Sequence, residues 1–435
     1  MIPDVSGARA LAHVREICER FGSRPAGSEK ERKAAEHIAA RFREFGLSEV
    51  VIEPFPCLTW DYSRASLTVA GAEIPCLPVA HSPATPAGGI EAELVYLERA
   101  SDIDLARVPL AGKIGLLSTL YGDDSERLRR LMDSGLAAVI LVDDRLPFDW
   151  TVAVGVPAQW IRLLSIPMVS IPYRHAWEIV RNGAQRARLE VATRVREAES
   201  QNVVGVVPGS DPTAGDILLT CHHDTVMNAV GAEDNGSGVA CVLELARAFA
   251  GSRPRRTLRF VACGCEEQLS EGSKEYVLRH RDEMPGAQFV LNTDSVGGWM
   301  GQNEVTVSGC PEMYRWLEGA QQATGFSAKL LDQVSPYSDH FPFTAVGVPG
   351  IWVHRTNCAG GRFFHHSALD TPDVLSPGVL DATLRFQARL LNDLAHAEEL
   401  PFPRAVPDAQ REVIARFWRD LYGVADQGDG AAPIR

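Results

Sequence analysis

The chain has 435 residues, of which 45% are hydrophobic and 23% are charged. This composition is typical of a globular protein, and it excludes the disordered, collagen-like and coiled-coil classes. The formal net charge of −13 argues against nucleic acid or an anionic membrane surface as the main partner. At roughly 150 residues per domain, the length allows two or three compact units.

The N-terminus and the cysteines predict a cytoplasmic protein. Residues 1–5 lack the basic and then apolar pattern of a secretory signal, and no stretch approaches the ~20 apolar residues that span a bilayer. The nine cysteines are an odd number and include no C-x-x-C pair. Such cysteine usage in a large chain favours a reducing compartment.

Residues 1–61 predict a helix that follows a glycine-rich loop at residues 22–27. Ser28 stands three residues before Glu31, which is the spacing of a capping box at a helix start. Four apolar residues then recur at the spacing of one helix face: Ala35, Ile38, Ala39 and Phe42. Gly46 is placed to end this helix.

Residues 62–195 change to short β-like runs that are separated by turns. The clearest runs are residues 65–69, 114–117 and 139–142, and one short helical stretch lies around Leu128 to Met132. The region contains few clustered His, Asp or Glu residues. We therefore expect a β-rich insert that takes no part in the chemistry.

Residues 196–400 repeat the order strand, loop, helix, which is typical of an α/β sheet. Short apolar runs suited to buried strands are residues 217–221, 257–263, 289–292 and 351–353. Residues 238–250 predict an amphipathic helix. In the remaining segment, residues 401–435, one helix face combines four residues: Ile414, Phe417, Trp418 and Leu421. We expect this face to pack on the body of the protein rather than on a second subunit.

Acids and imidazoles follow directly after three of the predicted strands. They are His222 and Asp224, Glu266 and Glu267, and Asp294. In open α/β sheets, ligands bind at the carboxyl ends of the strands. Carboxylates that converge there repel one another and cannot all stay ionised without a cation. The pattern therefore predicts a metal centre.

Each of these motifs has an ordinary structural interpretation when it is taken alone. Residues 234–237 are a natural N-cap cluster, and the pair His365-His366 is a weak metal signal. Their joint occurrence favours a metal site. Two histidines and three carboxylates suit zinc or a similar divalent ion, but five ligands exceed what one tetrahedral catalytic zinc needs. Two metals about 3.5–4 Å apart that share a carboxylate fit better.

Several motifs along the chain carry a family resemblance. They are Gly22-Ser23-Arg24-Pro25-Ala26-Gly27-Ser28, His222-x-Asp224, Gly231-Ala232-Glu233-Asp234-Asn235-Gly236-Ser237-Gly238, Glu266-Glu267-Gln268 with Gly272-Ser273, Asn292-Thr293-Asp294, Ser338-Asp339-His340-x-Pro342-Phe343 and His366-x-x-x-Asp370-Thr371. Together they resemble the aminopeptidase Y and glutamate carboxypeptidase II family, whose members are zinc exopeptidases with two co-catalytic metals. Residues 62–195 resemble a protease-associated domain in the pieces 112–114, 135–140 and 166–171.

The resemblance implies a role for each residue of the predicted site. His222 and Asp294 would hold one metal, Glu267 and His366 would hold the other, and Asp234 would bridge them. Glu266 matches the general base, and Asp224 matches the carboxylate that orients His222. Many relatives have a tyrosine just before the last metal-binding histidine, whereas this chain has His365, which is a candidate oxyanion donor.

The resemblance also implies the architecture. The fold would be that of the zinc exopeptidases, phosphorylase/hydrolase-like, with a mixed, mostly parallel central sheet flanked by helices. Residues 1–61 would be the first part of the catalytic domain, residues 62–195 the insert, residues 196–400 the second part with the metal site, and residues 401–435 a C-terminal helix and tail.

The leading functional prediction is a metal-dependent aminopeptidase that hydrolyses N-terminal residues from peptides, with a metal-bridging hydroxide and Glu266 as the base. A carboxypeptidase or dipeptidase of the same family is the alternative, and arginines facing a free carboxylate would favour it. A receptor-like binding protein would lack metal ligands, and none of the five is missing here. A glutaminyl-cyclase-like activity is disfavoured because such enzymes work with one zinc. A homo-oligomer is left open.

Overall fold

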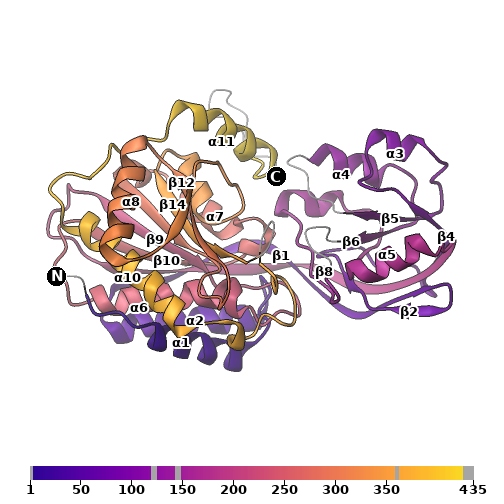
Figure 1. Ribbon diagram of the computed structural model, residues 1–435, viewed down its shortest axis with the longest axis horizontal. Helices are drawn as coiled ribbons and strands as arrows, with labels where there is room; N and C mark the ends of the chain where they lie inside the picture. Colours follow the sequence, from indigo (N-terminus) through magenta and orange to yellow (C-terminus); the bar gives the residue numbers. More distant parts are fainter. Residues whose placement is uncertain (1–2, 119–124, 143–147, 358–361, 425–435) are drawn as a thin grey trace.

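The computed structural model describes residues 3–118, 125–142, 148–357 and 362–424. These residues form two units, a main domain and an insert, which are joined by the long strands β1 (Ser48–Val69) and β8 (Arg186–Val207). Figure 1 shows both strands leaving the main domain and continuing into the insert.

The secondary structure alternates between strands and helices along most of the chain. The helices are α1 (Gly7–Phe21), α2 (Glu29–Phe45), α3 (Asp102–Ala106), α4 (Ser125–Met132), α5 (Tyr173–Arg181), α6 (Ser237–Phe249), α7 (Glu271–Arg279), α8 (Pro311–Thr324), α9 (His340–Ala345), α10 (Pro377–His396) and α11 (Asp408–Asp420). Short helical turns are η1 (Ala158–Leu163), η2 (Ala232–Gly236), η3 (Glu266–Gln268), η4 (Met284–Gly286) and η5 (Pro372–Val374). The other strands are β2 (Ala72–Ile74), β3 (Leu77–Pro78), β4 (Ile90–Tyr96), β5 (Ile114–Ser118), β6 (Ala138–Val142), β7 (Met168–Ile171), β9 (Asp216–His222), β10 (Thr257–Cys263), β11 (Ala287–Thr293), β12 (Gln302–Ser308), β13 (Ala328–Leu331) and β14 (Gly350–Thr356).

The central sheet of the main domain has the strand order β13-β12-β14-β11-β9-β10-β8, with β1 paired to β8. Its middle strands β14, β11, β9 and β10 run parallel, whereas the β12–β14, β10–β8 and β8–β1 pairs are antiparallel. The predicted mixed, mostly parallel sheet is confirmed. The four strands predicted in residues 217–353 are β9, β10, β11 and β14. Most of their residues are buried, because helices cover both faces of the sheet.

Helices cover the two faces of this sheet with separate apolar layers. On one face α1, α2, α6, α8 and α10 share a single core that includes Phe42, Leu243 and Leu384. On the other face α7 and α9 pack through Tyr276, Val277 and Phe343. Helix α11 packs on the body, as predicted, with its aromatic residues around the ring of Phe341. Figure 1 shows α1, α2 and α6 on one side of the sheet and α11 on the other.

The predicted helix after the glycine-rich loop is α2, and its two ends are as expected. The hydroxyl of Ser28 accepts a hydrogen bond from the Glu31 backbone N–H, and Gly46 ends the helix in the left-handed conformation. The capping box differs in one respect: the carboxylate of Glu31 accepts from the N–H of Gly27, not from that of Ser28. Glu31 therefore ties the helix start to the preceding loop.

The insert contains more helix than predicted. Its sheet continues from β8 through β4, β5, β6 and β7 to β3, and β4 to β7 run parallel. The helical stretch predicted around Leu128 to Met132 is α4, and α3 and α5 are two further helices that were not predicted. Helix α5 buries only Ala176 and Ile179, so its apolar pattern was too short to recognise. The domain boundaries at residues 62 and 195 fall inside β1 and β8 and stay a prediction.

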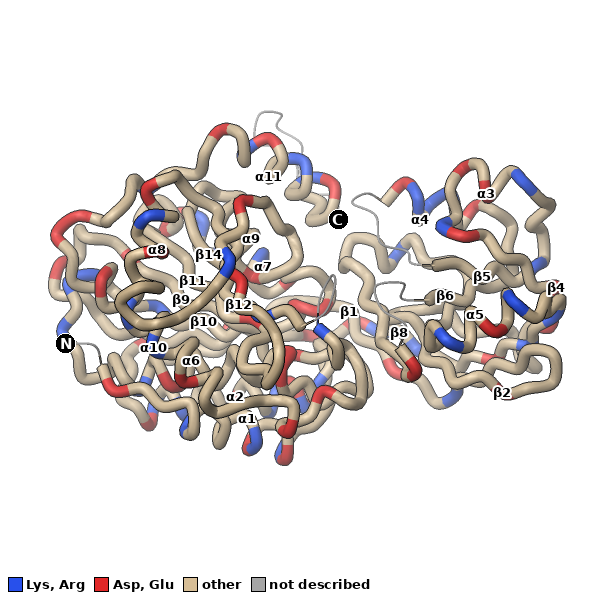
Figure 2. Tube along the Cα trace, viewed as in Figure 1, with Lys and Arg blue, Asp and Glu red and all other residues tan. Residues whose placement is uncertain are grey.

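Among the helices of the described ranges, none combines the length and the apolar character that a bilayer-spanning segment requires. Acidic and basic positions are intermixed along both units (Figure 2). On the outer helices they form ion pairs one turn apart, such as Arg20 with Glu16 and Lys33 with Glu29. The eight cysteines of the described residues are free thiols, and Cys358 lies outside these residues, as do residues 425–435.

Candidate metal centre

Three adjacent parallel strands bring four of the predicted residues to one edge of the sheet. His222 is the last residue of β9, and Cys263 of β10 lies directly beside it in the strand register. Glu266 and Glu267 follow β10 in the turn η3, and Asp294 follows β11. Because β11, β9 and β10 are neighbours, their carboxyl ends place these side chains at one edge of the sheet.

Asp234 lies between two pairs of side chains. Its Oδ1 is 3.2 Å from Nε2 of His222, and that nitrogen is 3.5 Å from Oδ1 of Asp294. Its Oδ2 is 3.5 Å from Nε2 of His366, and that nitrogen is 2.9 Å from Oε2 of Glu267. The structure thus brings all five predicted ligands together, with each oxygen of Asp234 directed to a different histidine and carboxylate.

The chemistry of this cluster fits two divalent cations. Four carboxylates lie within 4 Å of the His222 ring: Asp224, Asp234, Asp294 and Glu266. Both ring nitrogens of His222 are buried and lack a hydrogen-bond partner among the described residues. Burial opposes protonation of this ring, yet the surrounding carboxylates raise its pKa well above the usual value, which reports a strongly negative site. Imidazole and carboxylate donors are the set that zinc prefers.

Asp224 supports the turn that carries the two glutamates. Its Oδ1 lies 3.5 Å from Nδ1 of His222, on the side of the ring opposite the cluster. Its two oxygens also accept hydrogen bonds from the backbone N–H groups of Glu266, at 2.9 Å, and Glu267, at 3.2 Å. The hydrogen bonds to the two backbone N–H groups could not be derived from the sequence. Asp224 therefore lies beside the His222 ring and holds the turn η3, which carries both glutamates.

Glu266 lies beside the first pair of ligands rather than in either pair. Its Oε2 is 3.8 Å from Nε2 of His222, and Oε1 accepts a hydrogen bond from the hydroxyl of Ser270 at 3.2 Å. Burial raises the pKa of Glu266 well above its usual range, and the carboxylates of Asp294 and Asp339 add to this shift. Cations placed in the cluster would lower that pKa again.

Residues outside the predicted set hold the ligands. The hydroxyl of Ser338 donates to Oδ2 of Asp294 at 2.8 Å, and it accepts from the Asn292 side chain at 2.6 Å. Asp370 accepts from the backbone N–H of Asp234 at 3.0 Å. Ser338, Asn292 and Asp370 all belong to the motifs of the family resemblance, so the signal for them was present. No role had been predicted for them.

Arg362 is a member of the site that the sequence did not reveal. Its Nη2 donates to Oδ2 of Asp234 at 2.9 Å and lies 2.7 Å from Nδ1 of His365. Nδ1 of His365 lies 2.8 Å from the same carboxylate oxygen, so Arg362 and His365 both contact Asp234. Burial alone would raise the pKa of Asp234, but Arg362 and the histidines hold it well below the usual range.

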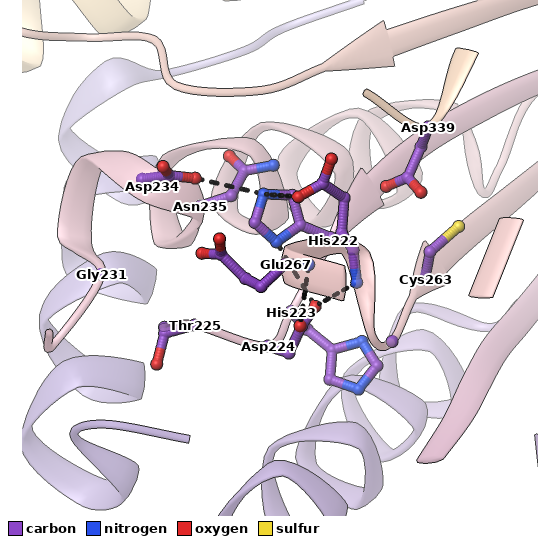
Figure 3. Close-up of polar contacts among 12 residues, drawn as sticks. His222, His223, Asp224, Thr225, Gly231, Asp234, Asn235, Cys263, Glu267 and Asp339 are labelled. Carbon is purple, nitrogen blue, oxygen red and sulfur yellow. Dashed lines mark hydrogen bonds and ion pairs between the residues drawn. The ribbon is translucent and has the colours of Figure 1, made fainter. Parts of the chain in front are cut away.

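Three other histidines near the cluster have different surroundings. Figure 3 shows the ring of His222 directed toward Asp234, whereas the ring of His223 points away from it. Burial lowers the pKa of His223 to about 4. His340 stacks on Trp352, and His354 forms a hydrogen bond with Thr306. Neighbouring residues at the end of a strand point to opposite sides, so only the first histidine of the pair enters the cluster.

Comparisons with known proteins show that the chain is similar to a peptidase family and to individual exopeptidases. The profile of peptidase family M28 matches residues 202–391. The chain is 28% identical to aminopeptidase YwaD of Bacillus subtilis over 346 residues, 78% of this chain and 73% of that protein. It is 24% identical to carboxypeptidase Q of Xenopus laevis over 387 residues, 85% and 82% of the two chains.

Solved structures resemble the whole described fold. An aminopeptidase from Aneurinibacillus sp. strain AM-1 superposes with a TM-score of 0.72 at 25% identity, covering 92% of this chain and 96% of that one. A peptidase M28 precursor from Shewanella amazonensis superposes with a TM-score of 0.77 at 23% identity, covering 92% and 95%. The second likeness concerns the fold alone.

Proposed function

We propose that the chain, whose residues 202–391 match the profile of peptidase family M28, is a two-metal exopeptidase that removes N-terminal residues from peptides. The family match confirms the predicted zinc metallopeptidase class. One observation supports the proposal for this site. The two oxygens of Asp234 face two separate pairs, each made of a histidine and a carboxylate. The residue assignments stay a proposal.

The residues around the cluster supply what peptide hydrolysis needs. His222, Asp294, Asp234, Glu267 and His366 would hold two zinc ions, which polarise a carbonyl and lower the pKa of water. Glu266 stands beside the cluster without belonging to either pair, so it is free to take a proton from water and return it to the leaving amine. His365 and Arg362 contact Asp234 and can donate to the oxygen of the scissile carbonyl.

The test is Glu266→Gln, assayed on a panel of aminoacyl amides together with measured zinc per chain. Glutamine keeps the size of the side chain but cannot accept the proton, so we expect kcat to fall by about 10² to 10⁴-fold while two metals stay bound. Unchanged activity with both metals present would disprove the role of Glu266. One metal or none in the unmodified protein would disprove the two-metal site.

A carboxypeptidase or dipeptidase activity is the second candidate, and Arg362 is the observation that favours it. Its guanidinium lies within the cluster and is the kind of group that binds a free carboxylate. Carboxypeptidase Q proteins are also among the relatives that cover most of the chain. Peptides blocked at either end separate the two activities. An aminopeptidase should not cleave N-acetylated peptides, and a carboxypeptidase should not cleave peptides with a C-terminal amide.

We further propose that residues 62–195 form a protease-associated domain that covers one side of the cleft and limits access to short peptides. Its segment at residues 153–155 contacts the site, which supports this position.

We also propose that the protein is cytoplasmic, because the described cysteines are free thiols.

A further inference from the structure

We propose that the insert positions one of the two metal pairs, through a clasp formed by residues 148–156 around His366. This inference rests on the proposed two-metal site. In this proposal the insert affects how tightly one metal binds, in addition to limiting the access of peptides to the site. Three contacts of the clasp support it. The first involves His366, the second involves the aromatic residues just before it in the chain, and the third involves Glu267.

The first contact is a reciprocal pair of hydrogen bonds between Ala153 and His366. The backbone N–H of Ala153 donates to the carbonyl of His366 at 2.8 Å. The carbonyl of Ala153 lies 3.2 Å from Nδ1 of the same histidine. His366 has a φ of 56°, in the left-handed region that non-glycine residues rarely occupy, so its backbone needs such external support.

This contact decides which ring nitrogen can bind metal. When Nδ1–H donates to the Ala153 carbonyl, the lone pair of the imidazole is on Nε2. Nε2 is the nitrogen that lies 2.9 Å from Glu267 and 3.5 Å from Asp234. A partner of this kind on the far side of a ligating imidazole typically changes metal affinity 10 to 100-fold.

The second contact is aromatic. Trp150 meets Phe363 edge to face with ring centroids 4.9 Å apart, and it stacks on Phe364 at 6.1 Å. Phe148, which is 4% exposed, contacts Phe363 at 5.8 Å. These rings join the insert to the residues directly before His365 and His366. They hold the loop after β14 against the insert.

The third contact reaches the other ligand of the same pair. A Cβ at Gly155 would lie 3.0 Å from the carbonyl oxygen of Glu267, so the clasp approaches the turn η3 closely. Ala153 packs on Val226, whose backbone N–H donates to Oε1 of Glu267 at 3.1 Å. By contrast, His222 and Asp294 are held by Asp224, Ser338 and Ser295 of the main domain. The two metals should therefore differ in their dependence on the insert.

The experiment measures the two zinc dissociation constants separately, by titration against a competing chelator, in the full-length protein and in Trp150→Ala. We expect the affinity for one zinc to fall about tenfold or more, while the other changes less than about twofold. Trp177→Ala is the matched control, because Trp177 lies on α5 of the same insert and is 51% exposed. It should leave both constants unchanged.

If the circular dichroism spectrum shows that Trp150→Ala is not folded, a second variant, Gly155→Ala, provides the test. Gly155→Ala pushes a methyl group toward the Glu267 carbonyl, and it should weaken the same single zinc site. The proposal would be overturned if both zinc dissociation constants were unchanged in the folded variants. It would also be overturned if both zinc sites lost the same affinity. If the unmodified protein binds fewer than two zinc ions, the proposed function fails instead, which is a distinguishable result.

Discussion

The guanidinium of Arg24 donates a hydrogen bond from Nη1 to the backbone carbonyl of Val230 over 2.6 Å. Its Nε donates to the carbonyl of His223, and Nη2 donates to that of Gly231. The side chain is completely buried, and burial lowers its pKa. Arg24 thus ties the glycine-rich loop to the segment that leads into Asp234.

Replacing Arg24 by Met should destabilise the protein strongly. The substitution leaves several buried carbonyls without a donor, and we expect the free energy of unfolding to fall by about 3 kcal/mol or more. Arg24→Lys should also be destabilising, because an ammonium cannot reproduce the planar set of donors. Urea unfolding measures both. Arg32→Met, at a 52% exposed arginine side chain of α2, is the control and should stay within about 0.5 kcal/mol.

Replacing Asp224 by Asn should weaken zinc binding and catalysis together. The amide cannot accept from both glutamate N–H groups and orient His222 as a carboxylate does, so we expect metal affinity to fall about 10 to 100-fold. Chelator titration and kcat measure the two effects. Asp211→Asn, in the segment that precedes β9, should leave both unchanged. Full metal affinity in Asp224→Asn would contradict the orienting role.

Removing the metals should lower thermal stability. A zinc ion that binds only the folded protein adds about 2.7 kcal/mol at a free concentration of 100 times its Kd. Scanning calorimetry with excess chelator and with added zinc should therefore give a clearly higher Tm in zinc. The variant Asp234→Ala, which lacks the bridging carboxylate, should lose most of the zinc-dependent gain. An equal gain in that variant would show that zinc acts elsewhere.

His81 should make stability fall as the pH is lowered. Burial lowers its folded pKa from 6.5 to about 4. Between these two values the unfolded chain binds a proton that the folded protein does not, so acid favours unfolding. The cost is about 2 kcal/mol between pH 7 and pH 5. Urea unfolding of metal-free protein at both pH values should show a smaller difference in His81→Gln, and an equal difference would refute the assignment.

Local patterns were sufficient for the elements that carry the site. Buried strands β9, β10 and β11 appear as apolar runs, and the acids that follow them are visible in the sequence. Helix α1 was not predicted, although Ala10, Val14, Ile17 and Phe21 mark its buried face. The outer parts of β1 and β8 carry exposed charged residues, so only their pairing with each other defines them as strands.

The supporting groups of the metal centre depend on contacts that are remote in the chain. Ala153 and His366 are 213 positions apart, and both of their hydrogen bonds involve the backbone, which no residue type signals. Arg362 was unrecognisable among many arginines, because only the folded loop brings it to Asp234. Ligand types are visible in a sequence, whereas the groups that orient them are defined by the tertiary structure.

The long ladder of β1 and β8 has a mechanical consequence. Each strand has 22 residues, and the two pair from Ser48 and Val206 to Val69 and Ala187. At about 3.3 Å per residue this arm extends roughly 70 Å, with cross-strand bonds along its length. Because the two strands are bonded to each other, the connection between the two units is a paired ribbon, which bends less easily than a single extended segment would.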